Sequence, residues 1–169
     1  FCLSRGLGDV YKRQIEHHWR VRRVFPPQVL DLIEQAIRAG EVTHSGQVRF
    51  VVEGALDGKP LFSGQSARER ALDIFSHLRI WDTVHNNGVL IYLLLADRDV
   101  EIVADRGIDA KVGSAGWDKI CKAMEADFRG GNFSGGVIKG IQAVSQQLAT
   151  YFPKQGAGPN ELPDKPIVM

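Results

Sequence analysis

Cysteine is almost absent from this chain, since Cys2 and Cys121 are the only two among 169 residues. Cys121 falls at an apolar position of a helical pattern, so neither a disulfide framework nor a cysteine zinc site is expected. Long apolar runs are also missing: the longest, at 88–96, is shorter than the roughly 20 residues of a membrane-spanning helix. Neither sign of charge dominates, because 21 basic and 20 acidic residues leave a net charge of +1. We therefore predict no nucleic-acid partner.

The beginning of the chain shows no leader. Residues 9–14, Asp-Val-Tyr-Lys-Arg-Gln, match the translated end of a transposon adaptor used in sequencing libraries. We therefore interpret residues 1–14 as an assembly artefact and leave them out of the fold prediction. No signal or transmembrane segment is visible, and the localisation and whatever precedes Ile15 stay open. The chain is 44% apolar and long enough for one globular domain with a real core.

Apolar periodicity and turn residues predict alternating helices and strands. A basic segment at 15–25 forms a short helix ahead of a domain that spans 26–153. The first two predicted helices are 27–39 and 66–79, and the second of them begins with a Ser66–Glu69 capping box. Ser114 caps a third helix, whose apolar face carries Trp117, Ile120, Cys121, Met124 and Phe128. A fourth helix follows the glycine-rich break at 130–136. The predicted strands are 47–55, 88–96 and 99–105. Residues 154–169 have no apolar periodicity, so we predict a disordered tail.

The order of these elements predicts the fold class. A strand, a helix and a second strand form a βαβ unit, which makes the strands at 47–55 and 88–96 parallel. The hairpin at Asp97-Arg98 adds an antiparallel third strand. We predict an α/β fold, namely a three-layer α/β/α sandwich with a small mixed sheet covered by helices on both faces. Ligands of such sheets bind beyond the carboxyl ends of parallel strands, an edge that carries Glu53 and the 97–99 turn.

Several short motifs resemble those of one known family. They are Asn87-Gly-Val-Leu-Ile-Tyr-Leu-Leu, Asp97-Arg98, Val100-Glu-Ile-Val, Arg106-Gly-Ile and Phe128-Arg-Gly-Gly-Asn-Phe-Ser-Gly-Gly-Val-Ile-Lys-Gly-Ile. Over residues 26–152 the chain thus resembles the TPM domain family, which includes a thylakoid-lumen acid phosphatase and many bacterial envelope proteins. The resemblance implies the same α/β/α fold, the acid phosphatase activity of some members, and the divalent-metal binding, chiefly of calcium, of others.

The chain departs from the family pattern at two places. The common Asp-Asn-Gly before the central strand is Asn86-Asn87-Gly88 here, and the common Gly-Tyr-Gly-Leu after the hairpin is Asp105-Arg106-Gly107-Ile108. One acid is thus lost at a strand end, and another is gained one strand away. The resemblance therefore implies a rearranged metal site around Asp105.

Acidic and amide side chains gather near the strand ends, and their oxygens are the ligands that Ca²⁺ uses. A hairpin sends its turn and its two ends to opposite edges of a sheet, so one site cannot hold them all. The favoured site, for Ca²⁺ or another divalent metal, consists of Asp82, Asn86, Asn87 and Asp105. The rival centre consists of Glu53, Asp97 and Asp99. The alternative interpretation is that these are solvated turn residues that hydrogen-bond the backbone.

No signature of a nucleophile accompanies the acids, so the catalytic residues stay unknown, with Asp105 and Arg106 as candidates. Hydrolysis of a phosphate ester here would use metal-activated water or an aspartyl nucleophile, with Arg106 helping to hold the phosphate. The loop at 130–136 lacks the lysine and hydroxyl residue of a P-loop, so we interpret it as a turn between helices rather than an anion site. Among the histidines, only His85 is kept as a candidate ligand.

Two functions remain open. The first is a metal-dependent, phosphatase-like hydrolase of small phosphate monoesters. The second is a non-catalytic, envelope-associated bacterial domain that serves the assembly or maintenance of a membrane protein complex, with membrane proteins or a membrane surface as partners. Arg20, Arg22 and Arg23 would meet anionic lipid if an anchor preceded them, but we interpret them as a solvated basic face.

Overall fold

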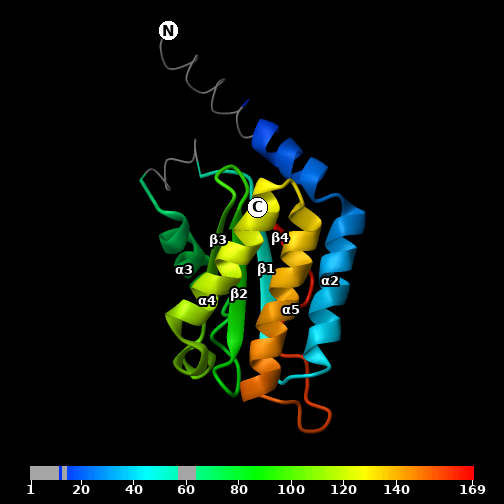
Figure 1. The fold of residues 1–169 in the computed structure, drawn as a ribbon, viewed down its shortest axis with the longest axis vertical. Helices are drawn as coiled ribbons and strands as arrows, with labels where there is room; N and C mark the ends of the chain where they lie inside the picture. The colour runs from blue at the N-terminus through cyan, green and yellow to red at the C-terminus, as the bar shows by residue number, and fades with distance from the viewer. Residues whose placement is uncertain (1–11, 13–14, 57–63) are drawn as a thin grey trace.

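The predicted strands form one four-stranded sheet in the order β3-β2-β1-β4 (Figure 1). β1 (Gln47–Glu53) and β2 (Gly88–Leu94) are parallel, and β2 and β3 (Asp99–Ala104) form the antiparallel hairpin. Every position of β1 and β2 is buried, as in strands that are covered on both faces. A two-residue strand, β4 (Ile167–Val168), adds to the outer edge of β1. The computed structural model describes residue 12 and residues 15–56 and 64–169.

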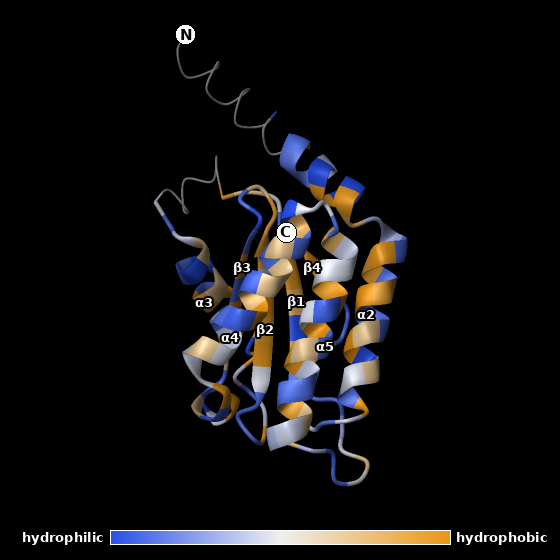
Figure 2. Ribbon diagram, viewed as in Figure 1, coloured by the Kyte–Doolittle hydropathy of each residue, from blue (hydrophilic) through white to orange (hydrophobic). Residues whose placement is uncertain are grey.

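Helices cover both faces of this sheet. α2 (Pro27–Glu41), α4 (Arg106–Arg129) and α5 (Phe133–Tyr151) pack on one face, and α3 (Ala67–His77) packs on the other (Figure 1). In Figure 2 the strands are largely orange, whereas blue hydrophilic residues recur along the outer sides of the helices. The fold is therefore the predicted three-layer α/β/α sandwich.

Alternation of side chains along the strands divides the core into two halves. The half beneath α2, α4 and α5 includes the strand residues Val48, Phe50, Val52, Val89, Ile91 and Leu93. The half beneath α3 includes Val51, Leu90, Tyr92, Leu94 and Val103. Each fully buried aliphatic side chain contributes roughly 1.5–3 kcal/mol, so both halves hold the sheet in place.

Two helix starts lie where the sequence predicts them. α2 begins at Pro27, whose fixed φ suits the first helical position. At the start of α3 the Ser66 hydroxyl accepts the Glu69 N–H (3.2 Å), and the Glu69 carboxylate accepts the Ser66 N–H (2.8 Å). The predicted capping box is thus present. The helix at 15–24 is also present, and Val21 anchors it in the core.

The start of α4 differs from the prediction. The helix begins at Arg106, one residue after Asp105, and not at Ser114. Gly113 interrupts it with a left-handed φ of 75° and a ψ of 163°, so α4 consists of two helical segments joined at a kink. The prediction recognised only the second segment, because a glycine with these angles breaks the apolar periodicity. The first segment brings Asp105 and Arg106 to the edge of the sheet.

The prediction of a disordered tail is wrong. Residues 154–169, which we call the C-terminal strap, run back along the domain and end in β4. The Gln47 side-chain oxygen accepts the N–H groups of Glu161 (3.0 Å) and Leu162 (2.8 Å). The Met169 N–H donates to Val52 O (2.9 Å). The strap is ordered by groups far away in the sequence, so a lack of apolar periodicity did not indicate disorder.

In the part of the chain that the structure describes, no helix combines the length and the apolar character needed to cross a membrane. Apart from Lys12, residues 1–14 lie outside the described residues. Their interpretation as an artefact therefore stays a prediction.

Candidate functional site

Three of the four favoured metal ligands lie at one end of the strands, where β2 begins and β3 ends. Asn86 and Asn87 directly precede β2, and the Asp105 N–H donates to Gly88 O (2.9 Å). Asp97 lies in the hairpin turn at the opposite edge. The structure thus separates the acids into two groups, as the hairpin geometry predicts.

Asp105 joins β3 directly to α4. Its extended backbone (φ −68°, ψ 155°) precedes the helix, and its Oδ1 accepts the N–H of Arg106 (2.8 Å), which makes Asp105 the N-cap of α4. The other carboxylate oxygen, Oδ2, is buried and has no hydrogen-bond partner within the described chain. Burying a carboxylate oxygen without a partner is costly. This atom therefore marks a place where a water molecule or a cation would be stabilised.

Two backbone carbonyl groups lie against the start of α4. Asn86 has a left-handed backbone (φ 51°), and its carbonyl oxygen accepts the N–H of Ile108 (3.3 Å). A methyl group on Gly107 would lie 2.5 Å from Asn86 O and 2.7 Å from His85 O. Only glycine permits this close approach. The corner near Asp105 thus contains carbonyl and carboxylate oxygens, which are the ligands of hard cations such as Ca²⁺.

Asn87 is fully buried but lies on the other side of the sheet from Asp105. Its side-chain amide donates to Ser45 Oγ (3.4 Å), and Ser45 Oγ in turn donates to Phe152 O at the end of α5 (3.4 Å). Alternation along β2 places Gly88, and with it the paired Asp105, on the α3 side. Asn87 Oδ1 is buried and unpartnered among the described residues, but it does not face the Asp105 carboxylate.

Asp82 and His85 lie at the surface of the same loop. Both are exposed, and the Asp82 N–H donates to Arg79 O (2.9 Å). Within residues 15–56 and 64–169, no group of three or more His, Cys, Asp or Glu side chains is placed to hold a metal ion. A cation at this edge would therefore depend on Asp105 and on backbone carbonyls rather than on an acidic cluster.

One member of the rival centre, Glu53, is engaged by other residues. Glu53 is buried beneath α3, where its Oε2 accepts hydrogen bonds from Arg70 Nε (2.9 Å) and from the Tyr92 hydroxyl (2.9 Å). Its Oε1 accepts a further one from Arg70 (3.3 Å). Asp97 and Asp99, by contrast, line an open hollow beside α4. The Glu53 carboxylate therefore belongs to an internal ion pair with Arg70.

A cavity of about 520 Å³, which no sequence pattern predicts, opens at the amino end of β1. Its lining includes Glu41, His44, His85 and Lys154. His44 is only 1% exposed, its Nδ1 is hydrogen-bonded to Gly46 O (3.1 Å), and its Nε2 has no partner within the described chain. Burial lowers the pKa of His44 to about 4, so the ring is neutral at neutral pH.

Glu41, the last residue of α2, is a second buried polar group beside this cavity. Its Oε1 accepts the Val48 N–H (3.2 Å). Burial raises the pKa of Glu41 to about 8, and the nearby carboxylate of Asp164 adds to this effect. Neither Glu41 nor His44 could be found from the sequence, because nothing in the residue spacing shows that a helix end is covered by the strap.

The first turn of α4 offers little to a phosphate. Arg106 is exposed, but its N–H is bonded to Asp105 Oδ1, and the Ile108 N–H is bonded to Asn86 O. The Asp109 N–H donates to Asp105 O (2.9 Å). Helix N-termini bind anions through free N–H groups, and three of those in this turn are occupied. In the structure, the candidate pair thus forms the start of α4, with Asp105 as the N-cap and Arg106 as the first helical residue.

The glycine-rich segment at 130–136 is the turn that the sequence predicts. It joins α4 to α5, which begins inside it at Phe133. Asn132 caps α5, because its Oδ1 accepts the Gly135 N–H (3.2 Å) and its carbonyl oxygen accepts the Gly136 N–H (3.0 Å). These donors are therefore not free for an anion.

The strand order, the covering helices and the polar edge together define an α/β/α domain with a candidate oxygen-ligand site. The TPM domain model matches residues 22–147. The chain therefore belongs to the TPM domain family, which confirms the resemblance of its motifs.

Two solved structures are similar to this chain. The NMR structure of the BA42 protein from the psychrophilic bacterium Bizionia argentinensis is 32% identical with a TM-score of 0.74, over 84% of this chain and 93% of that one. The solution structure of the N-terminal domain of a P. gingivalis protein is 21% identical with a TM-score of 0.59, over 72% and 74%, and shows the fold alone. The comparison with curated proteins found no match.

Proposed function

We propose that this TPM domain binds a divalent cation, preferentially Ca²⁺, at the corner formed by Asp105 and the carbonyl groups of His85 and Asn86. The observation that carries the proposal is the buried Asp105 Oδ2, which has no partner in the described chain. Ca²⁺ accepts carboxylate and carbonyl oxygens together with water. We assign no direct bond to Asp82, which is exposed, or to Asn87, which lies on the α5 side of the sheet.

The electrostatics of the corner favour weak binding. The amino end of α4 carries a partial positive charge that opposes a cation, and one nearby carboxylate offsets it. We expect a dissociation constant on the order of 10⁻⁴ to 10⁻³ M, as in extracellular calcium modules. Such a site would be occupied only where the Ca²⁺ concentration is close to this dissociation constant or above it, and it would be empty at trace concentrations of Ca²⁺.

The role that we propose is binding rather than hydrolysis. The N–H groups of Arg106, Ile108 and Asp109 are occupied, so they are not free to bind a phosphate. The family resemblance supports a setting in an envelope or membrane protein complex, where the cation would stabilise the domain for assembly or maintenance. Phosphate-ester hydrolysis is the competing function, and it is tested in the same experiment.

The test compares thermal unfolding with and without 10 mM Ca²⁺ for the full chain and for Asp105→Asn. A dissociation constant near 1 mM would stabilise the wild type by about 1.4 kcal/mol. Asparagine is as good an N-cap as aspartate, so the variant should fold but lose the calcium effect. Asp97→Asn, at the other edge, is the matched control and should keep it.

Equal stabilisation of the wild type and Asp105→Asn would refute the site. Both proteins are also incubated with an aryl phosphate at acid and neutral pH. Turnover by the wild type that Asp105→Asn abolishes would favour the hydrolase over the proposed binding role.

A further inference from the structure

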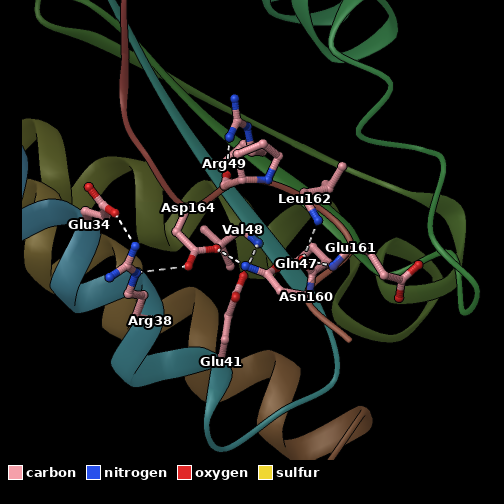
Figure 3. A network of polar contacts seen from close by, with 11 residues as sticks. Glu34, Arg38, Glu41, Gln47, Val48, Arg49, Asn160, Glu161, Leu162 and Asp164 are labelled. Carbon is pink, nitrogen blue, oxygen red and sulfur yellow. Dashed lines mark hydrogen bonds and ion pairs between the residues drawn. The ribbon is translucent and has the colours of Figure 1, made fainter. Parts of the chain in front are cut away.

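The strap is fastened at one polar cluster at the end of α2 (Figure 3). Glu41 there is 8% exposed and lies against Asp164 of the strap. The two carboxyl groups lie side by side in Figure 3. Two adjacent carboxylates in a buried place repel each other, and they can be joined by a hydrogen bond only if one of them carries a proton.

The contacts identify which residue is charged. Asp164 Oδ1 accepts a hydrogen bond from the Asn160 side chain (2.8 Å), and its Oδ2 accepts one from Arg38 Nε (3.3 Å). Both oxygens of Asp164 are thus held by donors, as a carboxylate requires. Glu41 has one such donor, the Val48 N–H. The proton therefore resides on Glu41.

Charged and titratable groups from every neighbouring element surround this pair. α2 contributes Arg38, and β1 contributes Arg49, whose guanidinium donates to Pro163 O of the strap. The loop before β1 contributes the neutral His44, and the strap itself contributes Lys154, whose Nζ donates to the Glu41 backbone oxygen (2.9 Å). These cations favour ionisation of Glu41. Burial and Asp164 oppose it, and burial is the largest effect, so the pKa of Glu41 is raised to about 8.

The other attachments of the strap are hydrogen bonds and the packing of Leu162, Ile167 and Met169 against the α3 side of the core. β4 pairs with β1 at only two positions, Val51 with Ile167 and Val52 with Val168. The Gln47 side chain adds two hydrogen bonds. Ionised Glu41 would place a second negative charge next to Asp164 in a buried position, and moving the strap away would relieve it.

We propose that a single proton shared by Glu41 and Asp164 latches the C-terminal strap to the domain, and that its loss at alkaline pH frees the strap from the edge of β1. The docked strap holds the proton more tightly than the free strap does. Docking is therefore strongest at low pH, where Glu41 is protonated, and weakens as the pH rises to about 8. Above that value no further weakening is expected.

The chain offers its own pair of probes, because it contains only two methionines. Met169 follows β4 and packs against the α3 side of the core, and Met124 is 1% exposed in the other half of the core. With ¹³C-methyl methionine in the full chain, the Met169 signal reports strap docking and the Met124 signal reports the fold. Both are followed from pH 5 to pH 9.5.

In the wild type we expect the Met169 signal to move to its free-chain position as the pH rises, while Met124 stays constant. Glu41→Gln keeps the hydrogen bonds to Val48 and Asp164 without a titrating proton, so Met169 should stay docked throughout. Asp164→Asn can donate to ionised Glu41 and should also stay docked at pH 9.5. Glu34→Gln removes a carboxylate about two turns earlier on α2 and should behave like the wild type.

A Met169 signal that does not move in the wild type overturns the proposal. The proposal also fails if Met169 moves in Glu41→Gln as it does in the wild type. If Glu41→Gln fails to fold, which Met124 would reveal, Asp164→Asn decides, because its change lies on the strap. Release in Asp164→Asn identical to that in the wild type would overturn the latch.

Discussion

The ion pair beneath α3 gives the most demanding test of how this domain is stabilised. Arg70 is 14% exposed and Glu53 only 1%, and two hydrogen bonds join them while the Tyr92 hydroxyl donates a third to Glu53. Replacing Arg70 by leucine would take an opposite charge and two hydrogen bonds away from the buried Glu53 carboxylate. Breaking a buried pair from one side costs about 3–5 kcal/mol, which is a large part of the stability of a domain this size.

Urea unfolding at pH 7 measures this loss in Arg70→Leu. Arg68→Leu is the matched control on the same helix, because the ion pair of Arg68 with Glu101 is 50% and 25% exposed. We expect it to cost less than about 1 kcal/mol from the ion pair. The double variant Glu53→Leu and Arg70→Leu should recover much of the loss, since the buried Glu53 charge is then removed as well.

Two results would show this reasoning to be wrong. One is a loss in Arg70→Leu no larger than in Arg68→Leu. The other is a double variant less stable than Arg70→Leu alone, which would mean that the pair itself, and not the relief of a buried charge, supplies the stability.

Two further predictions concern the sheet edge and the cavity. Gly107→Ala should destabilise the domain by about 1–3 kcal/mol, because its methyl group would meet two backbone oxygens that cannot swing aside. Gly158→Ala, with nothing within 4 Å, is its control, and equal urea midpoints for the two variants would contradict the close approach. For His44, burial lowers the pKa from 6.5 to about 4, so the folded state binds fewer protons than the unfolded state in this range. The free energy of unfolding should therefore fall by about 3 kcal/mol as the pH drops from 6.5 to 4. His44→Gln should flatten this part of the plot of unfolding free energy against pH. Parallel plots for the wild type and His44→Gln would contradict the assignment to His44.

The parts of the fold that the sequence predicted are those that local signals control. β1, β2 and the hairpin follow from β-branched residues and the Asp97-Arg98 turn, and α3 follows from its capping box. The same hairpin correctly separated Asp105 from Asp97. What local signals could not show is the direction of each side chain, so the sequence grouped Asn87 with Asp105 although the sheet lies between them.

The parts that the sequence missed depend on contacts made after folding. The first segment of α4 is short and ends at a left-handed Gly113, so its apolar spacing is too brief to recognise. The strap is ordered by Gln47, Arg49 and Arg38, which lie more than a hundred residues earlier. Glu41 and His44 likewise line a cavity together with residues of the strap, and residue spacing does not reveal this arrangement.

β1 is buried along its whole length, yet β4 pairs with it only at Val51 and Val52. Gln47 and Arg49 bond the strap instead, so much of this edge is shielded by side-chain contacts rather than by a full partner strand. An apolar strand with a bare edge can add a strand from another molecule. We therefore expect that removing the strap would expose this edge and favour association between copies of the chain. The resistance of the protein to aggregation in concentrated solution would then depend on residues 154–169 rather than on the core.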